Sequence, residues 1–131
     1  MILVDSNVPM YLIGSDHPHK VDARRLLERA VADRRRLVSD AEVFQEILHR
    51  YVAIDRREAI QPCYEVLLEV VDDVIPVDLP IVQRAREIVI GYPEMTARDA
   101  VHAAVMGEHG INEILSFDTH FDHLPGITRV V

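Results

Sequence analysis

The sequence lacks several features that would assign it to a special class of protein. Cys63 is the single cysteine, so no disulfide can form within the chain. No apolar run approaches the roughly 20 residues that a membrane-spanning helix needs. The apolar start, residues 1–4, is short and has no basic flank, so it does not resemble a signal peptide. Together these absences predict a cytoplasmic protein with no membrane association.

The motifs of several common enzyme classes are also missing. The chain contains no P-loop, no GxGxxG fingerprint and no GxSxG nucleophile motif. Its seven histidines are scattered, and no cysteine–histidine spacing suggests a zinc site. The chemistry of the protein therefore has to be sought among its acids.

The net charge of −8 argues against a simple basic nucleic-acid binder, but the charge is unevenly distributed. Residues 1–57 carry 10 basic and 9 acidic side chains, whereas residues 58–131 carry 4 basic and 13 acidic ones. Arginine pairs with carboxylate and with phosphate, so the basic first half could face either kind of partner. Solvated helix faces are the plainer interpretation of any single arginine.

The sequence does contain a regular alternation of short β-branched runs and helical patterns. Its 131 residues, 49% of them apolar, suffice for one domain, residues 1–131, with its own core. The predicted strands are residues 1–4, 37–39, 74–77, 113–116 and 128–131. The predicted helices are residues 8–14, 18–36, 40–54, 63–71, 79–91 and 96–109. This alternation is typical of βαβ units and a parallel sheet, so the predicted fold class is α/β.

Polar residues and prolines indicate where some of these elements begin and end. Ser15 or Asp16 could cap the second helix, and Ser39 or Asp40 could cap the third. Pro76 has no N–H group to donate to a neighbouring strand. Its strand should therefore lie at an edge of the sheet.

Two predicted strands end in aspartate. Asp5 follows the first apolar strand and Asp118 follows the fourth. Ligands bind at the carboxyl ends of the strands in open parallel sheets, so both residues are site candidates. A helix cap is an equally good interpretation of Asp5 alone, but two independent caps in the same context are harder to accept.

Three further acids lie on predicted helices. Glu46 has apolar neighbours, and its alternative role is an ion pair with Arg50 one turn away. Glu42 precedes Glu46 by one turn, and like charges at this spacing repel unless a cation lies near them, so Glu42 is a second candidate. Asp99 completes a capping box with Thr96, a role that does not exclude metal binding.

Acids that meet at one edge of a sheet suit a hard cation. Mg²⁺ and Mn²⁺ prefer oxygen ligands, and carboxylate-held metals neutralise a phosphate and activate water. Crowded carboxylates repel, so at least one pKa should rise without metal. His102, one turn after Asp99, is interpreted as a neutral histidine of the core or of a groove. The predicted divalent metal site, which would cut a phosphodiester, comprises Asp5, Glu46, Asp99 and Asp118.

The same acids stand in motifs that resemble those of PIN domains. The resemblance covers essentially the whole chain and rests on the opening strand with Asp5–Asn7, on Gln45–Leu48, on Arg98–Ala103 and on Ser116–Phe121. PIN domains of this size resemble VapC toxins, the ribonuclease half of prokaryotic type II toxin–antitoxin pairs. The resemblance implies a three-layer α/β/α fold with a central parallel sheet of four or five strands. It also implies RNA cleavage with Mg²⁺ or Mn²⁺, usually as a homodimer, and inhibition by a VapB-type antitoxin.

The family's site residues can be carried over to this sequence position by position. Its metal-binding catalytic acids would be Asp5, Glu46, Asp99 and Asp118. Ser116 matches a small hydroxyl residue that supports the metal or the phosphate, and Asn7 matches a polar position near the first acid. Asp122 falls where some members carry an additional acid, and Glu42 competes with Glu46 for the helix acid.

Two other functions stay open at this point. A receiver-like signalling domain fits the length and the alternation, but such domains need a late-strand lysine near the acids, and Lys20 is the only lysine. A catalytically idle PIN fold that acts only as a binding partner is the other, and the presence of all four acids argues against it. In a nuclease, basic residues of the first half would steer RNA, with candidates Arg24, Arg25, Arg34, Arg35 and Arg36.

Overall fold

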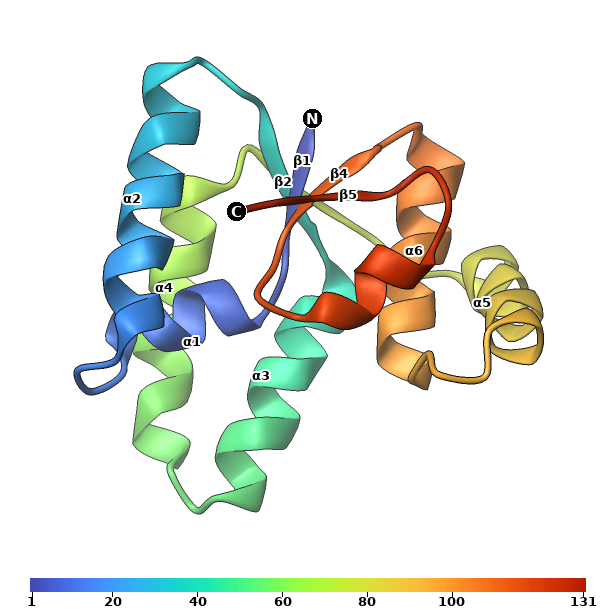
Figure 1. The fold of residues 1–131 in the computed structure, drawn as a ribbon. Helices are drawn as coiled ribbons and strands as arrows, with labels where there is room; N and C mark the ends of the chain where they lie inside the picture. Colours follow the sequence, from blue (N-terminus) through green and yellow to red (C-terminus); the bar gives the residue numbers. More distant parts are fainter.

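The computed structural model, which describes residues 1–131, contains one sheet of five short strands. Their order is β3-β2-β1-β4-β5, and every neighbouring pair is parallel. The strands are β1 (Ile2–Val4), β2 (Leu37–Asp40), β3 (Asp73–Ile75), β4 (Glu113–Leu115) and β5 (Thr128–Val130). Helices flank the sheet on both sides (Figure 1), so the predicted α/β/α fold with a parallel sheet is confirmed.

Alternation along the strands divides the core between the two faces of the sheet. Leu3, in the middle of β1, packs in one cluster with α5 (Leu79–Gly91) and α6 (Ala97–His109). Ile2 and Val4 point to the opposite face and pack in a second cluster with the other four helices. Those helices are α1 (Asn7–Ile13), α2 (Pro18–Ala32), α3 (Ala41–Ala53) and α4 (Ile60–Val70). Two short 3₁₀ turns, η1 (Arg57–Ala59) and η2 (Thr119–His123), complete the chain.

The helix caps that matter for the site form as predicted. Asp40 caps α3, because its Oδ1 accepts a hydrogen bond from the N–H of Val43 at 2.9 Å. Thr96 caps α6 by accepting from the N–H of Asp99 at 3.2 Å, which completes one half of the predicted capping box. Both caps lie at the carboxyl edge of the sheet or next to it. They fix Asp40 and Asp99 at that edge.

The predicted cap of α2 was wrong. His17 caps this helix in place of Ser15 or Asp16, and its Nδ1 accepts from the N–H of His19 at 3.0 Å. Pro18 at the start of the helix has no N–H group and a backbone already suited to a first turn, so the helix begins there. None of the helices combines the length and the apolar character needed to cross a membrane.

The position of β3 at an edge of the sheet agrees with the prediction from Pro76. The strand ends at Ile75, directly before the proline, and pairs only with β2. The central strands β2, β1 and β4 are left to form the middle of the sheet. The residues that follow these three strands at their carboxyl ends therefore lie side by side, which is the arrangement the site uses.

Candidate metal centre

Asp5 is held in place at the carboxyl end of β1. Val4 lies opposite Leu115 in the sheet, so Asp5 and Ser116 are neighbours just beyond the two strands. Ser116 Oγ donates to Asp5 Oδ2 at 2.6 Å, and Asn7 Nδ2 donates to the same oxygen at 3.3 Å. The N–H of Ser6 donates to Asp5 Oδ1 at 2.7 Å. Three donors thus orient one carboxylate that is only 3% exposed.

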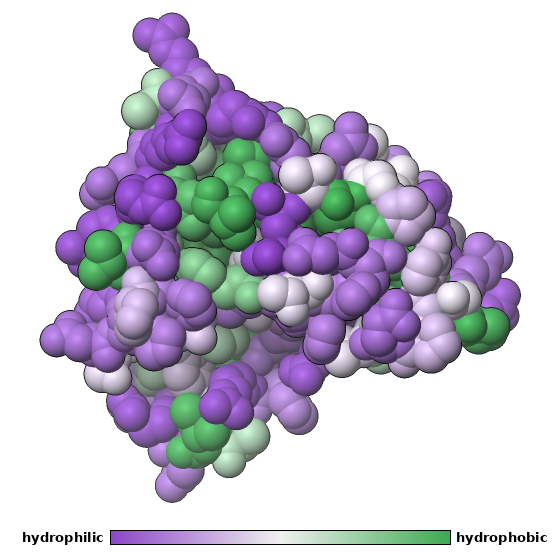
Figure 2. Space-filling view, in the orientation of Figure 1, coloured by the Kyte–Doolittle hydropathy of each residue, from purple (hydrophilic) through white to green (hydrophobic).

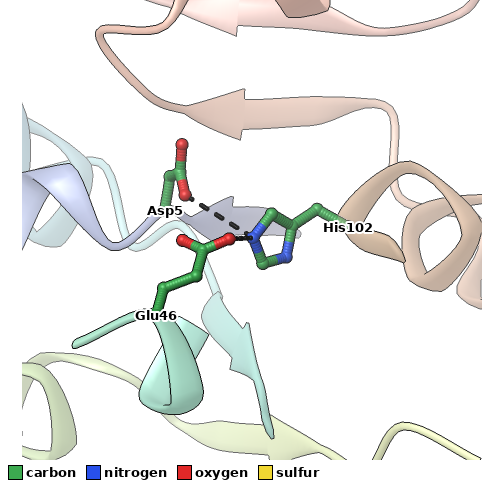
Figure 3. Close-up of side chains that lie close together, drawn as sticks. All are labelled: Asp5, Glu46 and His102. Carbon is green, nitrogen blue, oxygen red and sulfur yellow. Dashed lines mark hydrogen bonds and ion pairs between the residues drawn. The ribbon is translucent and has the colours of Figure 1, made fainter. Parts of the chain in front are cut away.

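Glu46 reaches the same place from α3. Its Oε2 accepts from Ser6 Oγ at 2.5 Å, and its Oε1 lies 2.7 Å from His102 Nε2 (Figure 3). Arg50, one turn along the helix, makes no ion pair with it, so the alternative role that the sequence allowed for Glu46 is wrong. Both oxygens of Glu46 have a protein partner, which fixes the orientation of the carboxylate.

His102 extends from α6 into the buried space between Asp5 and Glu46. Its Nδ1 lies 2.7 Å from Asp40 Oδ2, and its Nε2 lies 2.7 Å from Glu46 Oε1 and 3.8 Å from Asp5 Oδ1. Burial lowers the pKa of His102, but the three carboxylates, with Asp40 first, outweigh burial and raise that pKa well above its usual value. The interpretation of a neutral histidine was therefore wrong. Both ring nitrogens face carboxylates, so His102 supports the acids. Ligand atoms of Asp5, Glu46 and His102 lie within 4.8 Å of one another, so these three residues could also hold a metal ion together.

Sequence reasoning missed the second role of Asp40. This residue was expected only to cap α3, but one of its oxygens does so while the other faces His102. The two residues are 62 positions apart, so no local spacing points to their contact. The only available signal was that Asp40 ends the strand next to β1, much as Asp5 directly follows β1.

Two further acids lie on the more exposed side of the same site. His120 Nδ1 lies 3.4 Å from Asp99 Oδ2 and 3.2 Å from Asp118 Oδ1. The side chain of Asp118 is 29% exposed and that of Asp99 is 10% exposed. The N–H of Asp118 donates to Ser116 Oγ at 3.0 Å, and that hydroxyl in turn donates to Asp5. Ser116 therefore links the acids of β1 and β4.

All four predicted acids line one cavity of about 240 Å³. Met10 is the only hydrophobic residue among the 11 that form its walls. The remaining walls include the polar groups of Ser6, Asn7, Thr96 and His120. Several carboxylate and hydroxyl oxygens around a small polar space are the ligands that Mg²⁺ and Mn²⁺ prefer, so this donor set fits a hard divalent cation.

The pKa values of two of the acids rise, as the sequence predicted for a crowded site without metal. Burial raises the pKa of Asp5 to about 6; the charge of His102 opposes this shift, and the charge of Glu46 adds to it. Burial and the neighbouring charge of Asp118 raise the pKa of Asp99. The predicted direction is confirmed, but burial contributes more than the repulsion between carboxylates on which the prediction rested.

The structure does not bring Glu42 and Asp122 into the cavity. Glu42 lies one turn before Glu46 and does not line the cavity, although burial and the charge of Glu46 raise its pKa. Asp122 is exposed in η2, and its two oxygens accept from Nε and Nη2 of Arg129 at 2.8 and 3.0 Å. Asp122 therefore binds the guanidinium group of Arg129, on β5, and does not line the cavity.

Three of the arginines that were expected to steer RNA are also far from the acids. Residues 34–36 precede β2, at the amino ends of the strands, whereas the cavity lies at the carboxyl ends. Arg35 pairs with Glu113, and Arg25 pairs with Asp22 on α2. The arginines that do line the cavity are Arg50 and Arg98, and neither of them takes part in an ion pair.

The position of Lys20 weighs against a receiver-like domain. Its Nζ donates to the carbonyl oxygen of Gly14 at 2.8 Å, in the connection between α1 and α2. It does not line the acidic cavity. No lysine is therefore present to serve the phosphoacceptor chemistry that this alternative requires.

A parallel sheet with four acids at its carboxyl edge is an α/β architecture whose donor set fits a divalent cation, and similar proteins identify the family. The PIN domain family matches residues 2–127. The chain is 57% identical over 130 residues to VapC ribonuclease Mb1869c of Mycobacterium bovis and to ribonuclease VapC13 of Mycobacterium tuberculosis, with 99% of each chain covered. It is 36% identical over 118 residues to ribonuclease VapC23 of M. tuberculosis, which covers 90% of this chain and 93% of that one.

Solved structures share the same fold. M. tuberculosis VapC20, a toxin that cleaves the sarcin–ricin loop, superposes with a TM-score of 0.77 at 21% identity over 93% of both chains. VapBC2 from Rickettsia felis, bound to a DNA fragment from its promoter, gives a TM-score of 0.76 at 15% identity over 99% of this chain and 98% of that one.

The chain belongs to the PIN-domain family and, within it, to the VapC ribonucleases. The predicted function, a toxin endoribonuclease, is confirmed at the level of this family. The metal dependence and the roles of individual residues stay predictions.

Proposed function

We propose that the protein cleaves RNA with a divalent cation, Mg²⁺ or Mn²⁺, held by Asp5, Glu46, Asp99 and Asp118. The observation that carries this proposal is the convergence of the four acids in one polar cavity, from four different regions of the chain. RNA as the substrate is supported by the ribonuclease names of the relatives at 57% identity. When bound, the cation would neutralise charge on the scissile phosphate and activate a water for attack at phosphorus.

The residues of the chain hold the acids in the arrangement that a cation requires. Ser116 and Asn7 fix Asp5 from one side, and the N–H of Ser6 fixes it from the other. The raised pKa of Asp5, about 6, still leaves its carboxylate mostly ionised at neutral pH. The site is thus negatively charged and oriented before the cation arrives.

Asp40 and His102 serve as positioning residues for Glu46. The imidazole is completely buried and lies between the two carboxylates, so it cannot rotate without losing one of its two contacts. Ser6 Oγ holds the other oxygen of Glu46. Groups of this kind behind a metal site orient the ligands and commonly affect metal affinity or activity by about 10–100-fold.

We also propose that the protein acts in the cytoplasm, as a homodimer, and that it has a VapB-type antitoxin. The antitoxin is supported by the similarity to VapBC2 of Rickettsia felis and to a toxin–antitoxin complex of Klebsiella pneumoniae, the latter with a TM-score of 0.69 at 18% identity. An antitoxin is expected because an uninhibited ribonuclease would damage the cell that makes it. Co-expression with the product of an adjacent gene, followed by purification and a cleavage assay, tests this partner.

A single assay tests the ribonuclease itself. The purified protein is incubated with structured RNA and Mn²⁺, with EDTA and the Asp5→Asn variant as controls. We expect cleavage that requires the cation and is absent in the variant, because the amide cannot serve as an anionic ligand. Cleavage that survives Asp5→Asn would discredit the proposed centre.

A further inference from the structure

A second, larger cavity adjoins the acidic one. It measures about 490 Å³, within the range of about 300–1,000 Å³ that is typical of small-molecule sites. The two cavities share three wall residues, Asn7, Met10 and Arg50. The second one, here called the α1–α3 groove, lies between α1, the connection that follows it, the carboxyl-terminal part of α3 and η1. A molecule bound at the acids can therefore continue into this groove without leaving the protein surface.

Aromatic rings lie along one wall of the α1–α3 groove. The rings of Tyr11 and His17, both wall residues, have centroids 4.9 Å apart and are tilted by 32°. Tyr11 also meets Phe117 edge to face at 5.4 Å, and Phe117 directly precedes Asp118. The aromatic side chains thus extend from the strand end that carries an active-site acid into the groove. Such rings are the surfaces on which unpaired nucleobases stack.

Two arginines line the groove, and one of them is shared with the acidic cavity. Arg50 is exposed at the junction of the two cavities and belongs to no ion pair. Arg56, in the segment before η1, pairs only with Glu58, and both side chains are more than 60% exposed. An ion pair this exposed contributes little stability, so a phosphate can replace the carboxylate. All wall residues of the groove except Ala59 lie within residues 1–57, the part of the sequence where the acidic excess is absent.

We propose that the α1–α3 groove binds the nucleotides on one side of the scissile phosphate in a single-stranded RNA. The chain of the RNA would pass Arg50, stack a base on Tyr11 and His17, and place a phosphate near Arg56. The inference rests on the proposed ribonuclease function and adds a substrate subsite to it. Single-stranded RNA is specified because a base must be unpaired to stack on a protein ring.

Six of the 13 wall residues of the groove are hydrophobic, but its arginines, its aromatic rings and its continuity with the acidic cavity favour RNA over a polypeptide as the occupant. The groove combines aromatic rings with two arginines, which is the combination that binds bases and phosphates along a single strand. On the face drawn in Figure 2, hydrophilic side chains predominate, and hydrophobic ones form separate patches. Continuity with the acidic cavity adds a geometric reason, because the substrate of that cavity must leave it along the protein surface.

Binding measurements on an inactive background test the proposal directly. The Asp5→Asn variant is titrated with a fluorescein-labelled single-stranded RNA of about 12 nucleotides, and Tyr11→Leu or Arg56→Ala is added to it. We expect Tyr11→Leu to weaken binding about tenfold, since it keeps the apolar packing but removes the ring. Arg56→Ala should lower the slope of log affinity against log salt by about 1. Arg86→Ala, which removes an exposed arginine on the distant helix α5, is the matched control and should change neither value.

A photo-crosslinking experiment locates the RNA independently of the affinity. The same RNA carrying 4-thiouridine is irradiated with the Asp5→Asn protein, and the modified peptides are identified by mass spectrometry. Crosslinks within residues 10–17 or 50–59 are expected. Crosslinks only elsewhere, or equal affinity of all variants, would overturn the groove assignment, and a polypeptide-binding role for the groove would give the same negative result.

The failure of this inference can be told apart from the failure of the proposed function. If the unmodified protein cleaves RNA with Mn²⁺ but Tyr11→Leu and Arg56→Ala, made in that protein, leave KM and kcat unchanged, only the groove assignment is wrong. If the protein cleaves no RNA under any condition, the proposed function fails, and the binding data on Asp5→Asn still decide whether the groove takes RNA. Melting curves of each variant establish that any lost binding does not come from unfolding.

Discussion

The two sides of the acidic cavity are built differently. On the buried side, each oxygen of Asp5 and Glu46 has a protein donor or His102 within 2.7 Å. On the open side, one oxygen of Asp118 accepts from the N–H of His120 at 2.9 Å, while Asp99 lies 3.4 Å from the ring of His120, and that ring is 45% exposed. The fold thus fixes one pair of carboxylates before any ligand binds. The other pair keeps room for a cation and a phosphate to approach.

The two sides should also differ in how strongly a substitution lowers the stability of the fold. On the buried side the completely buried imidazole of His102, whose pKa the carboxylates raise, lies among three carboxylates that are at most 9% exposed, so removing one partner leaves a buried polar group unpaired. On the open side water can solvate whatever a substitution exposes. Substitutions on the two sides should therefore separate loss of function from loss of stability.

The largest effect on catalysis is expected from Asp5→Asn. Activity should fall by more than about a hundredfold, because the direct loss of a charged ligand exceeds the 10–100-fold cost of losing a supporting group. Millimolar Mn²⁺ should raise the melting temperature of the unmodified protein by mass action and should no longer raise that of the variant. Differential scanning fluorimetry with and without Mn²⁺ measures this, and an unmodified protein that melts at the same temperature in both would count against a metal centre.

Substitutions of His102 and His120 should differ more in their effect on stability than any other pair from the two sides. His102→Gln should destabilise the fold by about 3–5 kcal/mol and weaken Mn²⁺ binding, because Asp40 loses its buried cationic partner. His120→Gln, made on the open side, should change the free energy of unfolding by less than about 0.5 kcal/mol. Urea unfolding and calorimetric Mn²⁺ titration of both variants check this.

If His102→Gln does not fold, Asp40→Asn serves in its place, since the amide keeps a hydrogen-bonding group opposite the imidazole. Asp40→Asn is expected to lower stability less than His102→Gln does, and still to weaken Mn²⁺ binding. Equal stability of the His102 and His120 variants would show that the two sides do not differ as the hydrogen bonds indicate.

The pH dependence of stability should follow the buried side. The pKa of Asp5 is raised to about 6, so the native state holds its proton more tightly than the unfolded chain does. That contribution is fully present below pH 3.8 and is lost as the pH rises through about 6, at a cost on the order of 3 kcal/mol. The pKa of His102 is raised as well, so its contribution is complete below pH 6.5 and declines only at higher pH.

Urea unfolding of the metal-free protein at several pH values between 4 and 8 tests this prediction. The free energy of unfolding should decrease as the pH rises, and saturating Mn²⁺ at neutral pH should restore part of it, because the cation binds the ionised carboxylates. A metal-free protein whose stability increases steadily from pH 4 to pH 8 would show that the ionised acids do not destabilise the fold.

The sequence predicted the backbone and the cavity acids better than it predicted the contacts that lie behind those acids. Strand ends, helix caps and the edge position of β3 follow from local rules, so Asp5, Asp99 and Asp118 could be placed at one edge in advance. The contact between Asp40 and His102 depends on how α6 packs over the sheet, which no local pattern specifies. The same is true of the charge on His102, which three carboxylates from different elements produce together.

The smallest effect is expected at Asp122, the acid that the family pattern suggested and the structure directs elsewhere. Its two hydrogen bonds go to Arg129, whose Nη1 also donates to the carbonyl oxygen of Ser116 at 3.2 Å. Asp122→Asn keeps one acceptor for the guanidinium and leaves the four cavity acids untouched, so cleavage and Mn²⁺ affinity should equal those of the unmodified protein. Asp118→Asn, four residues earlier and inside the cavity, should lose both. A defect of similar size in the two variants, measured in the same cleavage assay, would mean that the acidic centre extends beyond the cavity into η2.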